Sequence, residues 1–160
     1  TTSIAGPYCA QALAALGADV IKVERPDTGD DGRAWGPPFW DGDSAMFLSA
    51  NAGKRSLAIS LRDPRGREAI LRLAETADVF LQSLRPGLAE EIGLGPADVR
   101  ARNPMLVYCS VGAYGHAGPL SGNAEEFHGD AHASYTASWP VSIRWATQPG
   151  CRHSIVYRLG

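Results

Sequence analysis

The feature that most constrains this chain is an alternation of short apolar runs with segments that carry helix signals. Four such runs, each of the length of a β-strand, lie at residues 19–24, 57–61, 78–81 and 105–110. Within the second run, Leu57, Ile59 and Leu61 alternate with small or polar residues, which is the period of a half-buried strand. Strands that alternate with helices predict an α/β fold built on an open, mostly parallel sheet.

The segments between the runs have residues that begin and end helices. Pro7 suits the first turn of a helix that Gly17 is placed to end. Asp63 and Pro64 are an N-cap and a first helical residue, and the helix that follows is expected to reach about Thr76. Shorter helices are expected at 88–92 and from residue 96 onward.

Two adjacent cations, Lys54 and Arg55, stand where a small-residue turn meets the strand that contains Leu57. Cations held by rigid structure beside a glycine can form a phosphate-binding site, because the backbone can approach the ligand closely at Gly53. The alternative is that both side chains are solvated residues at the start of a strand. The residues themselves leave both interpretations open.

Several candidate ligand-binding segments follow the expected strands directly. These segments are Arg25, Ser83–Arg85 and Gly112–Gly115. In open α/β sheets, ligands bind at the loops beyond the carboxyl ends of the strands. We therefore expect these segments to converge on one crevice.

The stretch between Arg25 and Ala45 is rich in glycine and proline and has no pattern of regular structure. Loops of this length are usually functional or disordered. Because the stretch also carries Trp35, Phe39 and Trp40, we expect an ordered, functional loop. The alternative is that the two tryptophans only cover an edge of the core.

The composition is that of an ordinary globular protein, and 160 residues suggest one domain. A net charge of −2 argues against nucleic-acid binding, which needs a concentrated basic face. No apolar run reaches the ~18 residues of a membrane span, and the first residues do not have the pattern of a signal peptide. The three cysteines lie far apart, which favours reduced thiols. We expect a cytoplasmic protein that binds neither nucleic acid nor membrane.

Several familiar site motifs are absent. Leu48 stands where a P-loop ending at Gly53 needs its first glycine, and no G-x-G-x-x-G occurs near the amino terminus. Ser110 has no glycines at the spacing of a nucleophile elbow. His128 and His132 are four residues apart, but no glutamate follows His128, so we interpret both as solvated loop histidines and expect no metal site.

A set of motifs spans nearly three quarters of the chain. These are Ala5-Gly6-Pro7, Leu16–Glu24, Gly53-Lys54-Arg55-Ser56, Arg85-Pro86-Gly87, Ile92-Gly93-Leu94, Asn103–Tyr108 and Tyr114–Pro119. In their order and spacing they resemble the class III CoA-transferases, a group that includes formyl-CoA transferase, carnitine CoA-transferases and α-methylacyl-CoA racemase. The resemblance implies a Rossmann-like sheet with helices on both faces, a homodimer of interlocked chains, and transfer of CoA between an acyl-CoA and a small carboxylic acid.

The resemblance also implies roles for particular residues. Arg25 and the pair Lys54 and Arg55 would contact the nucleotide end of CoA, whose phosphates need cations. Ser83, Leu84 and Arg85 occupy the loop where the family often has Asn-Phe-Arg, so only the arginine of that triplet is retained. Ala5 corresponds to the small residue beside the path by which CoA enters.

The family's nucleophile is an aspartate that attacks the acyl-CoA thioester and forms aspartyl intermediates. Its expected position is occupied by Phe127, and Asp130 is the candidate that remains if the preceding loop is longer. The family pattern covers 1–121, whereas 122–160 is an atypical tail, expected to be disordered or to result from a frameshift. We interpret the chain as an amino-terminal fragment of the family's large domain.

Two alternatives to CoA transfer remain open. One is proton transfer of the racemase kind by His128 with a carboxylate. The other is a non-catalytic remnant that binds CoA weakly at most.

Overall fold

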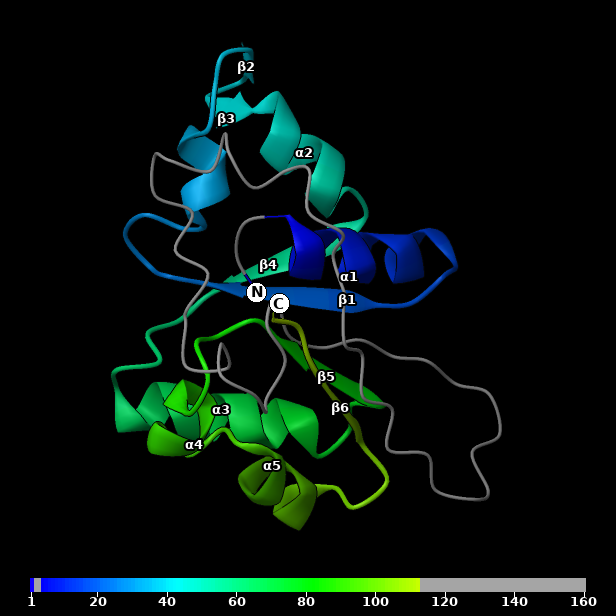
Figure 1. Ribbon diagram of the computed structural model, residues 1–160, viewed down its shortest axis with the longest axis vertical. Helices are drawn as coiled ribbons and strands as arrows, with labels where there is room; N and C mark the ends of the chain where they lie inside the picture. The colour runs from blue at the N-terminus through cyan, green and yellow to red at the C-terminus, as the bar shows by residue number, and fades with distance from the viewer. Residues whose placement is uncertain (2–3, 113–160) are drawn as a thin grey trace, which may run out of the picture.

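The computed structural model describes residue 1 and residues 4–112 (Figure 1). Its elements are, in chain order, α1 (Ala5–Ala15), β1 (Val20–Glu24), the 3-10 helix η1 (Asp31–Ala34), β2 (Phe39–Trp40), β3 (Asp43–Ser44), α2 (Ala45–Asn51), β4 (Lys54–Ala58), α3 (Pro64–Ala74), β5 (Val79–Gln82), α4 (Leu88–Glu91), α5 (Pro96–Arg102) and β6 (Val107–Ser110). Each expected helix is present, and so are three of the expected strands. The strand expected at 57–61 is displaced to 54–58, so Ile59 and Leu61 follow β4 instead of lying within it. The expected α/β class is confirmed.

The strands form separate small sheets where the sequence predicts one open sheet. β1 pairs in parallel with β4, and β5 pairs in parallel with β6. The short strands β2 and β3 form an antiparallel hairpin. Among the described residues no strand bonds β1 to β5, and the two parallel pairs touch through side chains such as Val20, Val79 and Leu81. The expectation of a single sheet is corrected to two parallel pairs within the described part of the chain.

Helices cover both faces of the β5–β6 pair. On one face Phe80 packs in a cluster with Ile70 of α3 and Val99 of α5. On the other face Val79 and Leu81 pack against Ala10 of α1. This division follows from the strand period of two, which sends successive side chains to opposite faces. All four residues of β5 are buried as a result.

The helix ends show how the local sequence sets these boundaries. The Asp63 side chain accepts a hydrogen bond from the backbone N–H of Arg65 at 2.9 Å, and Pro64 takes the first helical position of α3, as predicted. Helix α2 is not predicted by the sequence analysis. It is capped by Ser44, whose Oγ accepts from the N–H of Phe47 at 3.0 Å, and it buries Phe47 and Ala50.

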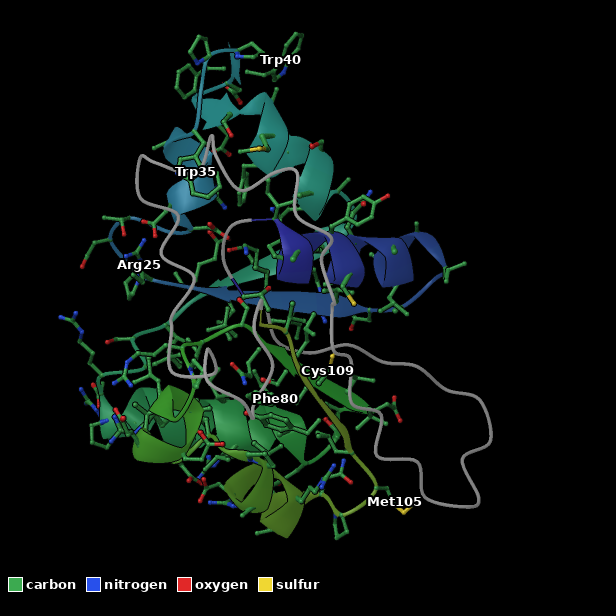
Figure 2. All side chains as sticks on the ribbon, in the orientation of Figure 1. Arg25, Trp35, Trp40, Phe80, Met105 and Cys109 are labelled. Carbon is green, nitrogen blue, oxygen red and sulfur yellow. The ribbon has the colours of Figure 1, made fainter. Side chains whose placement is uncertain are left out.

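The stretch between Arg25 and Ala45 is more regular than the sequence predicts. It contains η1 and the β2–β3 hairpin, whose turn is Asp41-Gly42, both with positive φ. An Asp-Gly turn between short extended segments is a known hairpin signal. Trp40 lies in β2 and is 76% exposed, so it does not cover a core edge (Figure 2).

The fully buried Ser44 hydroxyl joins α2 to η1, because it caps α2 and also donates to the carbonyl of Gly32 at 2.6 Å. We expect Ser44→Ala to lower the free energy of unfolding by about 2 kcal/mol, since it removes a cap and leaves a buried carbonyl without its donor. Urea denaturation measures this. Ser49→Ala is the matched control, because Ser49 is exposed and bonds only within its own helix. An equal effect of the two substitutions would contradict the role of Ser44.

Candidate functional site

The carboxyl ends of β1 and β5 lie on the same side of the molecule. Val20 and Val79, which begin these strands, pack in one cluster. Val23 and Gln82, near the ends of the same strands, line one small cavity. The two strands therefore point the same way, and the residues that follow them form one edge. This edge is where α/β sheets bind ligands.

Arg25 follows β1 directly and reaches the solvent at this edge (Figure 2). Its Nε donates to the carbonyl of Gly29 at 3.0 Å, and its Nη2 pairs with the carboxylate of Asp31. The backbone turns back between these residues, because the N–H of Gly29 donates to the Arg25 carbonyl and Gly29 has a φ of 65°. The guanidinium is thus oriented by the chain that follows it but stays exposed.

Behind Arg25, the carboxylate of Glu24 is buried in a polar network. It accepts hydrogen bonds from Nε and Nη2 of Arg33 at 2.8 and 2.9 Å, from Ser56 Oγ at 2.8 Å, and from the N–H of Asp30 at 3.0 Å. Burial alone would raise the pKa of Glu24. The hydrogen bonds from Arg33, Ser56 and Asp30 outweigh burial and lower this pKa to about 2.

Three further interactions fix the segment that follows Arg25. Arg33 also donates to Asp43 at 2.7 Å, and its guanidinium lies 4.0 Å from the centre of the Phe47 ring. The hydrogen bonds that Arg33 donates to Glu24 are the main reason why the pKa of Arg33 is raised. Lys22 and Asp30 form a buried ion pair at 2.6 Å. Together these contacts fix η1 and the β2–β3 hairpin.

Ser83, Leu84 and Arg85 follow β5 at the same edge. Leu84 lines the cavity, and its N–H donates to Oε1 of Gln82 at 2.6 Å. Arg85 makes two parallel hydrogen bonds to Glu91, at 3.1 and 2.7 Å, and is exposed. The structure therefore brings Arg25 and the segment Ser83–Arg85 to one edge, as predicted from the strand ends. The third predicted segment, Gly112–Gly115, lies outside the described residues except for Gly112.

Lys54 and Arg55 lie at the other end of the strands. Val20, the first residue of β1, pairs with Lys54, and Glu24, the last, pairs with Ala58. The predicted junction between a turn and a strand is confirmed, since β4 begins at Lys54 directly after Gly53. The structure does not bring this pair together with Arg25.

The two cations also point in different directions, because they are neighbours on a strand. Lys54 Nζ donates to the carbonyls of Pro7 and Ala50 at 2.7 and 2.9 Å and to Oδ1 of Asn51 at 2.7 Å. Burial, followed by the charge of Lys22, lowers the pKa of Lys54 to about 7.

Arg55 instead pairs with the exposed Asp19 through two hydrogen bonds, at 2.9 and 2.6 Å. In this structure Lys54 joins α1 to α2, and Arg55 lies at the surface. The expected pair of adjacent cations is therefore divided between two surroundings.

The remaining predicted residues can be placed more briefly. Ala5 is exposed as the first residue of α1. Asp130, His128 and His132 lie outside the described residues. Within residues 1 and 4–112 no group of histidine, cysteine and carboxylate side chains could hold a metal ion, and no helix is long and apolar enough to span a membrane.

Sequence reasoning misses the Glu24–Arg33 network and the partners of the exposed arginines. The available signal is the charged run Asp30, Asp31 and Arg33 inside a glycine-rich stretch. Such a run indicates a polar cluster but does not identify which partner each side chain takes.

The carboxyl-edge arginines, beside an apolar cavity in an α/β fold, define a candidate binding site for an anionic ligand with an apolar part. Residues 1–132 match CoA-transferase family III, and the chain belongs to this family.

Curated relatives include succinyl-CoA:glutarate CoA-transferase of Mus musculus, 47% identical over 124 residues, which cover 78% of this chain and 28% of the relative. Succinate–glutarate CoA-transferase of Agrobacterium fabrum is 47% identical over 125 residues, which cover 74% of this chain and 31% of the relative. The chain thus spans less than a third of the length of these relatives.

Solved structures agree with the family assignment. A CAIB/BAIF family protein from Brucella suis matches with a TM-score of 0.73 and 44% identity over 78% of this chain and 34% of that one. The D175A mutant of Rv3272 from Mycobacterium tuberculosis matches with a TM-score of 0.72 and 42% identity, covering 79% and 34%. These likenesses support an α/β domain in the described part of this chain.

Because the Glu24 carboxylate is ionised in the folded state well below the pH at which an unfolded glutamate protonates, it stabilises the fold at neutral pH. This contribution is full above the ordinary pKa of 4.5 and is lost as the pH falls toward 2. We expect Glu24→Gln to lower the free energy of unfolding at pH 7 by about 3 kcal/mol. The difference in the free energy of unfolding between the variant and wild type should become smaller as the pH falls from about 5 to about 2.

Urea denaturation at a series of pH values measures this gap. Glu75→Gln is the control, because Glu75 is exposed and bonds only to Arg102 on the surface. A gap that stays constant from neutral to acidic pH would show that Glu24 is not the titrating group.

Proposed function

We propose that this chain binds the nucleotide end of CoA, and that the protein to which it belongs transfers CoA from an acyl-CoA to a carboxylic acid. The observation that carries the proposal is the position of Arg25 and Ser83–Arg85 at neighbouring carboxyl strand ends beside an apolar cavity. Membership of CoA-transferase family III supports the same chemistry.

Each group at this edge has a use in holding CoA. The guanidinium groups of Arg25 and Arg85 can give charge-assisted, forked hydrogen bonds to phosphate oxygens. Leu84 and Val23 offer apolar surface to the parts of the ligand that carry no charge. Ser83 and Ala5 are further predicted contacts. The predicted contacts of Lys54 and Arg55 stay a separate prediction, because these residues lie at the amino end of the strands.

The transfer step in this proposal uses Asp130 as nucleophile. Its carboxylate attacks the thioester carbonyl of the acyl-CoA, and the C–S bond breaks. CoA departs as a thiolate, and an acyl-aspartyl anhydride forms on the enzyme. The thiolate then attacks the aspartyl carbonyl and releases the first acid as a carboxylate. The acceptor carboxylate then attacks the aspartyl-CoA thioester and forms a second anhydride, from which the CoA thiolate takes the acceptor's acyl group. The Asp130 carboxylate is regenerated, and no step needs an oxidant or reductant.

The names of the relatives suggest the substrates. Two are named for succinyl-CoA or succinate together with glutarate, so we propose small dicarboxylic acids as donor and acceptor groups. The proposal also includes a homodimer as the working unit and a cytoplasmic location, both of which rest on the family resemblance. Light scattering of the purified protein tests the dimer.

Arg25 is expected to supply a main phosphate contact. We expect Arg25→Gln to weaken binding of CoA by about ten-fold or more, since a hydrogen bond to a charged group is lost. Calorimetric titration measures this affinity. Arg72→Gln is the matched control, because Arg72 is an exposed arginine on α3 whose ion-pair partner is Glu68. Equal affinities of the Arg25 and Arg72 variants would contradict the proposed site.

The double variant Lys54→Ala/Arg55→Ala, titrated beside them, tests the separate prediction for that pair. A loss of CoA affinity with unchanged unfolding would support direct contact. A loss of stability with unchanged affinity for CoA would show that Lys54 has a structural role and connects α1 to α2.

Asp130 is tested by Asp130→Asn, which keeps the size of the side chain but removes its nucleophilic carboxylate. We expect the affinity for CoA to stay within about two-fold of wild type. The rate of CoA transfer from succinyl-CoA to glutarate, measured by chromatography of the CoA esters, should fall by at least ~10³-fold. Transfer at the wild-type rate would remove Asp130 from the mechanism. Binding without transfer in the wild type would favour the non-catalytic alternative.

A further inference from the structure

Both candidate phosphate-binding arginines hold a carboxylate that lies six residues further along the chain. Arg25 pairs with Asp31, the first residue of η1. Arg85 pairs with Glu91, the last residue of α4. A similar arrangement therefore occurs after β1 and after β5. An arginine beyond the strand end pairs with a carboxylate six residues on, which lies at the start of η1 in one case and at the end of α4 in the other.

Both pairs are open to water. The side chains of Arg25 and Asp31 are 56% and 61% exposed, and those of Arg85 and Glu91 are 49% and 55% exposed. By contrast, the Glu24 side chain paired with Arg33 is only 3% exposed. Exposed ion pairs contribute little net stability, so they can open at small cost.

The carboxylates occupy the hydrogen-bonding positions that a phosphate would need. Glu91 accepts from both Nη atoms of Arg85, so the fork formed by Nη1 and Nη2 of this guanidinium is engaged. On Arg25, Nε is taken by the carbonyl of Gly29 and Nη2 by Asp31. A phosphate that takes the same N–H groups must displace the carboxylate, and one that binds the other side of the guanidinium must share its positive charge with that carboxylate.

We propose that Asp31 and Glu91 are displaceable partners of Arg25 and Arg85, and that they set the affinity and selectivity of this edge for anions. Phosphate groups that carry more charge than a carboxylate displace Asp31 and Glu91, whereas a single carboxylate of a free acid gains nothing by the exchange. The ligand class is the phosphate groups of a nucleotide, so the inference rests on the proposed function and deepens it.

The test titrates CoA, and separately inorganic pyrophosphate and acetate, into wild type, Asp31→Asn and Glu91→Gln. We expect each substitution to tighten CoA and pyrophosphate about two- to five-fold, because the arginine no longer has to give up a charged partner. We also expect acetate to compete better with pyrophosphate in the variants than in wild type. Glu75→Gln is the control, because it removes the same charge but from a partner of Arg102, which lies on α5 and keeps its ion pair with Glu68.

A double-mutant cycle separates local displacement from a general change of charge. In an Arg25→Gln background, Asp31→Asn should no longer change the affinity for CoA, since the arginine it releases is absent. An equal gain from Asp31→Asn with and without Arg25 overturns the proposal, as does an equal gain from Glu75→Gln.

The failure of this inference and that of the proposed function give different results. If Arg25→Gln abolishes CoA binding but Asp31→Asn and Glu91→Gln leave wild-type affinity, the site stands and the displaceable partners are wrong. If wild type and all variants fail to bind CoA and pyrophosphate, both the site and this inference are overturned.

Discussion

The buried carboxylate of Glu24 is the interaction on which the carboxyl edge of β1 depends. It accepts hydrogen bonds from η1 through Arg33, from β4 through Ser56, and from the loop through the N–H of Asp30. A buried carboxylate without these partners would carry a large desolvation cost, so strand and loop must keep their places together. The next residue in the chain is Arg25, whose position follows from that of Glu24.

The direction of the strands sorts the cations of this domain. Arg25 and Arg85 follow the carboxyl ends of β1 and β5, and both remain exposed with carboxylate partners that water can reach. Lys54 and Arg55 begin β4. Lys54 bonds to carbonyls of α1 and α2, whereas Arg55 forms an ion pair at the surface. Parallel strands place the loops at their carboxyl ends on one edge of the molecule. The four cations, each next to a strand in the sequence, therefore differ in their surroundings according to which end of a strand they adjoin.

Two parallel pairs of strands, rather than one sheet, organise the described residues. Each pair is the product of strands joined by helical crossovers, which is the arrangement expected of an α/β protein. The pairs meet through apolar side chains from β1 and β5, and helices pack on both faces of β5–β6. The same packing creates the small cavity lined by Val23 and Leu84, so the core and the candidate site share the side chains of β1 and β5.

The order and type of the main elements could be predicted from the sequence, because they depend on local signals. Asp63 and Pro64 begin α3 through contacts within a few residues, and the run predicted at 78–81 forms β5 from residues rich in β-strand preference. The position of Arg25 at a strand end followed in the same way. The surroundings of Lys54 depended on the tertiary structure, because its acceptors include Pro7, 47 residues away. The bonds of Glu24 to Ser56 and of Arg55 to Asp19 likewise join residues more than 30 positions apart, so only the folded chain decides them.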